Sequence, residues 1–287
     1  MSDLEMTRMQ ENERTAVPLH RLSGESSQWQ AMREDVVEGL RAHTAWRALA
    51  AMDIRHKYRR SILGPFWITI TMGVLIAGVG VIYSKLFGMS LKEYLPFIAV
   101  GNIVWIYISS LFQEACLTFT SAESLIRSTR IPMTVHVLRV VLRAFVVFLH
   151  GAVIYIPVAL MYHVPSAEGV ALALFGVLLV FLFTIPVVVF LGILATRFRD
   201  LPPIISNFMQ LLFFITPILW DPKMLKEKRF IADLNPFYHL VEVVRAPLLG
   251  EAVPWTSYAT VGISTALLLL IAIPVFMACR QKLSIWV

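Results

Sequence analysis

Residues 169–196 read GVALALFGVLLVFLFTIPVVVFLGILAT, a run of 28 residues without Asp, Glu, Lys or Arg. A helix needs about 20 apolar residues to cross the hydrocarbon layer of a bilayer. A helix in the core of a soluble protein rarely needs an uncharged run of this length, because its outer face meets water. This stretch therefore predicts a transmembrane helix and excludes a soluble domain.

Five further uncharged stretches are long enough to span a bilayer. They are residues 61–84, 94–113, 144–167, 201–220 and 252–279. We expect the third span to begin earlier, near Val135, and a tight hairpin at residues 164–168 to join it to the fourth. The sequence therefore predicts an all-α integral membrane protein with six transmembrane helices.

The composition agrees with this class. The 287 residues are 57% hydrophobic and 15% charged, whereas an average soluble domain is about half apolar and a quarter charged. The net charge of +6 comes mainly from Lys and Arg beside apolar runs, which favours a membrane surface over nucleic acid. Cys116 and Cys279 lie in or beside apolar runs and predict neither a disulfide framework nor a metal cluster.

The chain divides into three parts. Residues 1–28 are polar, contain acidic residues and have no long apolar stretch, so we expect a flexible cytoplasmic tail rather than a signal peptide. Residues 29–60 alternate apolar and charged side chains with helical spacing, which predicts an amphipathic helix in the membrane interface. A small soluble helical cap is the alternative for this part. Residues 61–287 form the predicted six-helix transmembrane domain.

Basic residues set the expected orientation, since cytoplasmic loops carry an excess of Lys and Arg. They gather before the first span, between the second and third, between the fourth and fifth, and after the last. The loop before the last span also holds basic residues, but acidic residues offset them. Both termini are therefore expected on the cytoplasmic side.

The external segment before the last span has structure of its own. Residues 237–249 are apolar with helical spacing, Asn235-Pro236 is a helix start signal, and Gly250 is a stop signal. We expect one or two short helices within residues 221–250 that dip into the outer face or lie on it. An ordinary ordered loop is the alternative.

Catalytic and ATP-binding motifs are absent from the sequence: it contains no GxxxxGK[ST], HExxH, GxSxG or CxxC. Ionisable groups are also missing from the middle of the predicted spans, where an ion-coupled transporter needs them. Arg139 and Arg143 lie on one helix face near a cytoplasmic end. They either pair with Glu114 or form a positive entrance for an anionic head group such as pyrophosphate.

Aromatic side chains are frequent in the spans. Sugars stack their C–H faces on aromatic rings, so an aromatic path suits a glycan, although Trp and Tyr gather at membrane interfaces in any family. The candidate channel aromatics are Trp105, Tyr107, Phe112, Phe213, Phe214 and Trp220.

The stretch RHKYRRSILGPFW, residues 55–67, resembles the hallmark of permease subunits of type-2 ABC exporters for O-antigen, capsule or teichoic-acid polymers. The resemblance is closest to the O-antigen exporters. It extends to SAESLIRSTRIP (121–132), RFRDLPPIISNFMQLLFFITPILW (197–220) and NPFYHLVEVVRAPLLG (235–250). The matching residues of the first motif are Tyr58, Arg59, Arg60, Ser61, Leu63, Gly64 and Trp67. The first 28 residues are not covered.

The resemblance implies roles for specific residues. Arg55, Tyr58, Arg59, Arg60 and Trp67 would meet the lipid head group at the cytoplasmic entrance, where lipid phosphates lie. A short coupling helix that docks into the ATPase would comprise Glu123, Ser124, Leu125, Ile126 and Arg127. The outer gate would include Asn235, Pro236, Phe237 and His239.

The resulting expectation is a permease of the bacterial inner membrane that exports a lipid-pyrophosphate-linked polysaccharide to the periplasm. It would act as a homodimer with two copies of an ABC ATPase, so ATP and Mg²⁺ would bind the partner, and this chain would carry no cofactor. Its other partners would be the lipid-linked glycan and membrane lipids. The alternatives are an ion-coupled secondary transporter, an ABC permease for another lipid or drug, and an anchor for a periplasmic enzyme.

Overall fold

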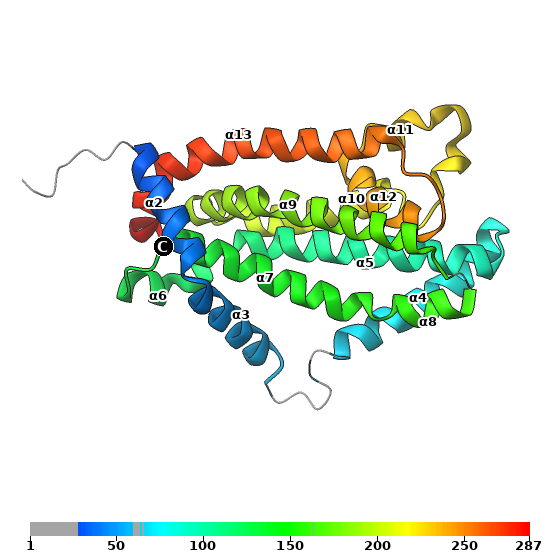
Figure 1. Ribbon diagram of the computed structural model, residues 1–287, viewed down its shortest axis with the longest axis horizontal. Coiled ribbons are helices and arrows are strands. Elements are labelled where there is room, and N and C mark those ends of the chain that lie inside the picture. Colours follow the sequence, from blue (N-terminus) through cyan, green and yellow to red (C-terminus); the bar gives the residue numbers. More distant parts are fainter. Residues whose placement is uncertain (1–27, 60–63, 65, 163) are drawn as a thin grey trace, which may run out of the picture.

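The computed structural model describes residues 28–59, 64, 66–162 and 164–287, and every regular element in these ranges is a helix (Figure 1). The helices of the membrane domain are α4 (Phe66–Phe87), α5 (Leu91–Cys116), α7 (Met133–Ala152), α8 (Tyr155–Tyr162), α9 (Ala167–Arg197), α10 (Leu201–Ile215) and α13 (Trp255–Trp286).

Within the described residues, five helical stretches are long and apolar enough to cross a membrane. They are α4, α5, the continuous pair α7 and α8, α9 and α13. The predicted sixth span, α10, is an apolar helix of only 15 residues, shorter than the roughly 20 that a full crossing needs. The multi-pass helical fold is thus confirmed, whereas a sixth complete crossing stays a prediction.

Helix α5 is the centre of the bundle. It contacts α4, α7, α8, α9, α10 and α12, and its residues from Tyr94 to Ile108 are almost all buried. By contrast, α4 and α13 bury few residues, although both are strongly apolar. Apolar helices that stay exposed in a single chain suit a lipid environment or a second subunit.

The prediction of one continuous amphipathic helix over residues 29–60 is wrong, because the described part of this range forms two helices. These are α2 (Gln28–Arg41) and α3 (His43–Lys57), separated at Ala42. The imidazole Nδ1 of His43 donates to the carbonyl oxygen of Arg41 at 3.0 Å. This hydrogen bond gives the Arg41 carbonyl a partner at the junction of the two helices. Residue 60 lies outside the described residues.

Helix α2 is fixed by Asp35, which is almost fully buried. Its carboxylate accepts from the backbone N–H groups of Met133 and Thr134 at 3.1 and 3.0 Å, at the free N-terminal end of α7. It also pairs with Arg280 of α13 at 3.2 Å. One carboxylate thus joins three helices at the end that also holds the C-terminus (Figure 1).

The hairpin predicted between the third and fourth spans is confirmed. Helix α8 ends at Tyr162 and α9 begins at Ala167. The side chain of Ser166 caps α9 by accepting from the N–H of Gly169 at 3.0 Å. Before this hairpin, a turn at Val153 and Ile154 interrupts the α-helical hydrogen bonding between α7 and α8, and the N–H of Ile154 donates to the carbonyl of Gly151 at 3.1 Å.

The segment before α13 contains three short helices rather than one or two: η3 (Pro222–Lys228), α11 (Phe230–Asp233) and α12 (Pro236–Leu248). The predicted start and stop signals are confirmed, since Asn235 caps α12 and Gly250 has a φ of +76° just after it. The first of the three, η3, begins at a cap that the prediction did not include, since Asp221 accepts from the N–H of Lys223 at 2.8 Å.

Helix α12 penetrates the bundle instead of lying on its outer face. The carbonyl of Pro247 lies beside Gly169 in the first turn of α9, and that of Val243 lies beside Gly176, two turns deeper. Both glycines leave room for a carbonyl that a side chain would displace. Ten of the thirteen residues of α12 are buried, as expected for a helix that enters a bundle from one end.

Candidate functional site

A network of charged side chains joins α3, α5 and α7 near the end where the C-terminus lies. Asp53 of α3 accepts from Arg139 Nε at 2.6 Å and from Arg143 Nη1 at 2.7 Å. Arg143 Nε also donates to Glu114 at 3.1 Å, and Lys57 Nζ lies 3.4 Å from the same carboxylate. The predicted pairing with Glu114 is therefore confirmed for Arg143, whereas Arg139 pairs with Asp53.

This network changes the expected role of the two arginines. Asp53 and Arg139 are only 11% and 12% exposed, so the guanidinium groups are held by carboxylates and largely withdrawn from solvent. A phosphate would have to displace Asp53 or Glu114 to reach them. The geometry therefore favours the structural alternative, in which Arg139 and Arg143 fasten the interfacial helix α3 to the bundle.

The basic motif lies beside this network. Arg55 and Arg59 are exposed, and Trp67 at the start of α4 is 56% exposed. Arg60 lies outside the described residues. Gly64 has a φ of +55°, a conformation that glycine adopts easily.

Tyr58 differs from its neighbours because its side chain faces inward. Its hydroxyl is buried and makes no hydrogen bond within the described part of the chain. Burial raises the pKa of the phenol, and the nearby charge of Glu114 raises it further, so Tyr58 stays neutral at physiological pH. Its hydroxyl therefore keeps its proton, but it lies inside the chain and not on the exposed surface that holds Arg55 and Arg59.

The predicted coupling residues form a separate short helix, α6 (Glu123–Ser128). Figure 1 shows α6 at the end of the bundle that also holds α2 and the C-terminus. Ile126 is buried and anchors the helix, Leu125 is half-buried, and Glu123, Ser124 and Arg127 are exposed. Such a helix presents one apolar and several polar side chains to whatever lies beyond this end.

Four aromatic residues from three helices meet inside the bundle. Trp105 lies 6.0 Å from both Phe213 and Phe237, and Phe112 lies 5.6 Å from Phe237, measured between ring centroids. Trp105 is only 4% exposed, so in the single chain this cluster packs α5, α10 and α12 together. The predicted gate residue Phe237 thus contacts two of the predicted channel aromatics.

The other candidate aromatics are more dispersed. Tyr107 is buried on another side of α5, where its ring lies 4.9 Å from that of Phe148. Phe214 is 61% exposed, and Trp220 is half-buried and donates to the carbonyl of Phe214 at 3.1 Å. Of this set, Phe214 is the most accessible from outside the chain.

The turn that follows α10, residues 216–220, is held by side chains from other elements. The carbonyl of Pro217 accepts from Arg245 Nη1, and the carbonyl of Leu219 accepts from the Tyr94 hydroxyl, both at 2.6 Å. Thr216 Oγ1 accepts from the side-chain amide of Asn235 at 2.9 Å. Non-helical backbone inside a membrane bundle needs such partners, because water is absent there.

Arg245 is buried in α12 and is fully paired. Its guanidinium donates to Glu242 at 3.0 and 2.6 Å and lies over the ring of Phe97, 4.1 Å from the centroid. The predicted gate residue His239 is also engaged, between Ser257 Oγ at 2.9 Å and the carbonyl of Asp233 at 2.7 Å. Pro236 is the exposed first residue of α12.

The chain matches the ABC-2 type transporter family over residues 44–249, which span every element from α3 to α12. The chain belongs to this family. As an ABC-2 type transporter chain it is a component of membrane transport, and its exposed apolar helices agree with a multi-pass membrane protein.

Curated relatives resemble this ABC-2 transporter chain over most of their length. The O-antigen export system permease protein RfbA of Myxococcus xanthus is 25% identical over 248 residues, which cover 82% of this chain and 92% of the relative. The protein of the same name in Klebsiella pneumoniae is 24% identical over 239 residues, covering 80% and 90%. A second Klebsiella pneumoniae RfbA is 26% identical over 198 residues, covering 66% and 74%.

Sequence reasoning missed four charged residues that organise this ABC-2 transporter chain. Asp53 and Asp35 were overlooked because an acid in an amphipathic helix normally faces water. The signal that could have found Asp53 is the excess of basic side chains on the facing helix, where Arg139 and Arg143 need a counterion. Glu242 and Arg245 are three residues apart, a spacing that allows a pair on one helix face.

Proposed function

We propose that this chain is the permease subunit of an ATP-driven exporter that moves a lipid-pyrophosphate-linked polysaccharide from the cytoplasm to the periplasm. Two copies would enclose the channel, and two ABC ATPase subunits would bind at the end that holds α6. The termini would then lie in the cytoplasm, and the membrane would be the bacterial inner membrane.

The observation that carries the proposal is the position of α6. A helix anchored by one buried residue, Ile126, with Leu125 half-buried beside exposed polar side chains, suits docking to another protein. Since the sequence has no P-loop, the energy of ATP hydrolysis must reach this chain through such a contact. The ABC-2 family match supports a partner ATPase, because transporters of this kind are driven by one.

The substrate class rests on the relatives and on the basic interfacial motif. The O-antigen export permeases in Myxococcus and Klebsiella share most of the chain's length with it. In this proposal the exposed side chains of Arg55 and Arg59 receive the pyrophosphate of a lipid-linked glycan at the entrance. With Arg139 and Arg143 engaged by carboxylates, the motif is the more available positive surface.

Docking of α6 can be tested by substitution of Leu125 with glutamate. We would purify the full-length chain with ATPase subunits encoded beside it, and measure both co-elution and ATP hydrolysis. Leu125→Glu should abolish the complex or uncouple hydrolysis from substrate, since a charge would enter an apolar docking contact. Leu40→Glu is the matched control, because Leu40 is 55% exposed on α2 and the chemical change is the same.

Two results would contradict the proposal. In one, the chain binds no ATPase and transports substrate alone, which would return the ion-coupled transporter to consideration. In the other, Leu125→Glu and Leu40→Glu behave alike. A complex that assembles but exports a drug or another lipid would support ATP-driven transport by an ABC exporter and would contradict a glycan as the substrate.

A further inference from the structure

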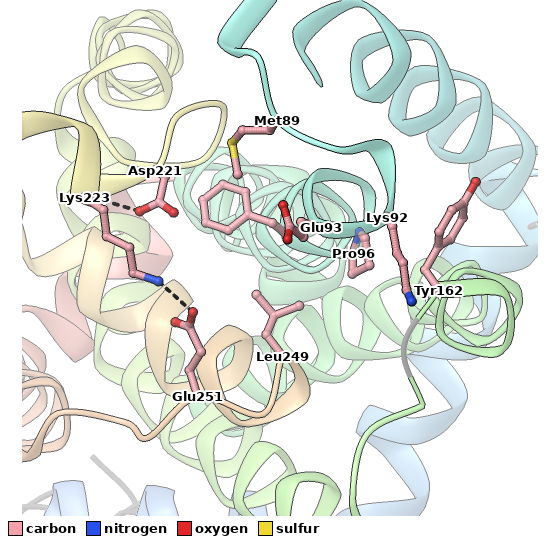
Figure 2. Close-up of a pocket in the computed structure, with 10 residues that line it drawn as sticks. Met89, Lys92, Glu93, Pro96, Tyr162, Asp221, Lys223, Leu249 and Glu251 are labelled. Atoms are coloured by element: carbon pink, nitrogen blue, oxygen red, sulfur yellow. Dashed lines mark hydrogen bonds and ion pairs between the residues drawn. The ribbon is translucent and has the colours of Figure 1, made fainter. Parts of the chain in front are cut away.

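Two cavities lie one beneath the other at the end of the bundle opposite α6. The outer cavity has a volume of about 530 Å³ and is lined by charged and polar side chains together with apolar ones (Figure 2). The deeper cavity has a volume of about 180 Å³ and is lined almost wholly by apolar side chains. We infer that together they hold one zwitterionic aminophospholipid, with its head group in the outer cavity and an acyl chain in the deeper one.

The two cavities share three helices and are offset along each in the same direction. On α5 the lining residues pass from Phe97 to Val100, and on α8 from Tyr162 to Tyr155. At the end of α12 they pass from Leu249 to Leu248 and Val244. With a rise of 1.5 Å per residue, the offset is about 5 Å along α5 and about 10 Å along α8. A head-group layer is about 5–8 Å thick on each side of the hydrocarbon core, so the offset fits one lipid.

The charges in the outer cavity select the head group. Lys223 Nζ donates to Glu251 at 2.7 Å, and the carboxylate of Asp221 accepts from the backbone N–H of Lys223, so these three groups are engaged. Lys92 and Glu93 form no ion pair with any described residue. The Lys92 ammonium and the neighbouring Glu93 carboxylate are therefore available to a ligand. They match the phosphate and the neighbouring amine of a zwitterionic lipid head group.

Figure 2 shows how these groups are arranged. Lys92 and Tyr162 lie together on one side of the cavity, Lys223 and Glu251 lie on the opposite side, and Glu93 lies between them. The Lys92 ammonium can donate to phosphate oxygens and Glu93 can accept from the lipid amine, whereas the Tyr162 hydroxyl points away from the Lys92 ammonium. An anionic lipid without an amine would leave Glu93 unpaired.

The deeper cavity suits an acyl chain because of its lining and its opening. Val100, Ile103, Phe148 and Ala173 form its walls, and all are buried. On its rim, Leu174 is 64% exposed, so the cavity opens toward the apolar surface of the bundle. An apolar cavity that meets the bilayer is filled by hydrocarbon rather than by water.

The test is lipid binding by the full-length chain, delipidated in detergent and examined by native mass spectrometry. Phosphatidylethanolamine and phosphatidylglycerol with identical acyl chains are added separately. We expect one phosphatidylethanolamine per chain, bound about tenfold more tightly than phosphatidylglycerol, since a charge-assisted hydrogen bond to the amine distinguishes them. Equal binding of the two lipids would overturn the inference.

Substitutions then locate the site. Lys92→Gln should weaken phosphatidylethanolamine binding about tenfold, and Glu93→Gln should remove the preference over phosphatidylglycerol. Lys228→Gln and Glu227→Gln are the matched controls, because both residues are exposed, both lie in η3 and neither lines either cavity. If controls and test variants bind alike, the outer cavity is not the site.

The acyl chain is tested by Ala173→Phe, which fills the deeper cavity. This variant should lose the lipid while its elution volume stays that of the unaltered chain. If it misfolds, Val177→Leu, a smaller filling change at the same wall, replaces it. Unchanged lipid binding in a folded, filled variant would overturn the inference, as would a soluble oligosaccharide that binds the outer cavity in place of the lipid.

Discussion

A Cβ atom placed on Gly176 of α9 would lie 2.1 Å from the carbonyl oxygen of Val243 in α12. Side-chain carbon atoms do not approach a backbone oxygen so closely, so the two helices can keep this distance only while residue 176 is glycine. The contact fixes the depth of α12, because Gly169 makes the equivalent approach to Pro247 two turns away.

Gly176→Ala should therefore separate α9 from α12 and lower the free energy of unfolding by about 1–3 kcal/mol, the usual cost of overpacking. The measurement is unfolding by SDS in mixed micelles. Gly78→Ala on α4 is the control, because nothing lies within 4 Å of its Cβ position. Alanine is the better helix former, so the control should be neutral or stabilising by up to about 1 kcal/mol. Equal effects at the two positions would refute the tight contact.

Asp53 is the shared acceptor of two arginines, and its removal should loosen α3. Asp53→Asn should lower the free energy of unfolding by about 3 kcal/mol. This is the low end for a broken buried ion pair, because Arg143 keeps its pair with Glu114. The free energy of unfolding and protease access to α3 would both report the change. Glu123→Gln serves for comparison: its pair with Arg127 is about half exposed and worth under about 1 kcal/mol. A loss no larger than that of Glu123→Gln would show that the network is weak.

The pair of Glu242 and Arg245 should be more sensitive still, because the arginine side chain is only 2% exposed. Glu242→Gln leaves a buried guanidinium without its carboxylate and should cost about 3–5 kcal/mol. Replacing both residues, as Glu242→Leu with Arg245→Met, should recover part of this loss. A deficit of about 1–3 kcal/mol should remain, since the carbonyl of Pro217 then loses its donor.

The unfolding of these variants would be followed in the same micelles, with Glu251→Gln as the exposed control. Its carboxylate is 49% exposed and pairs with Lys223 at the surface, so little change is expected. Should the double variant be less stable than Glu242→Gln alone, the assignment of the cost to an unpaired charge would be wrong.

Asn235 has two separable roles at the start of α12. Its side-chain oxygen accepts from the N–H of Phe237 at 3.0 Å, and its amide donates to Thr216. Asn235→Asp keeps the cap but loses the donor to Thr216, and should lower the free energy of unfolding by about 1 kcal/mol. Asn235→Ala loses both interactions and should lower it by about 2 kcal/mol. Amide hydrogen exchange at Phe237 would separate them, with faster exchange expected only for the alanine variant. Similar exchange in both would argue against the cap.

Much of the fold followed from hydropathy alone. Five stretches that cross the bundle coincide with predicted spans, because lipid solvation requires a long apolar run whatever the tertiary contacts are. The start of α12 at Asn235 was also predictable, since capping is a local interaction between a side chain and the next turn. Of the candidate site, a short helix at the expected coupling residues is present as α6, whereas the roles of the entrance, gate and channel residues stay predictions.

The remainder depends on tertiary contacts that no local pattern contains. The position of α2 depends on the hydrogen bonds of Asp35 to the start of α7, and Met133 is 98 residues away from Asp35 in the sequence. Likewise, the charges of Arg139 and Arg143 are neutralised by Asp53 from another helix. The depth of α12 depends on two glycines in α9. Their role can be recognised only from the carbonyl groups of α12 that pack against them.

The turn at residues 216–220 has a mechanical consequence. Its polar groups are held by α12 through Arg245, by the cap of α12 through Asn235 and by α5 through Tyr94. Since α10 continues directly into this turn, a displacement of α10 relative to α12 would have to pass through these three hydrogen bonds. Movement of α10 would therefore either carry α12 with it or break the hydrogen bonds that Arg245, Asn235 and Tyr94 make to the turn.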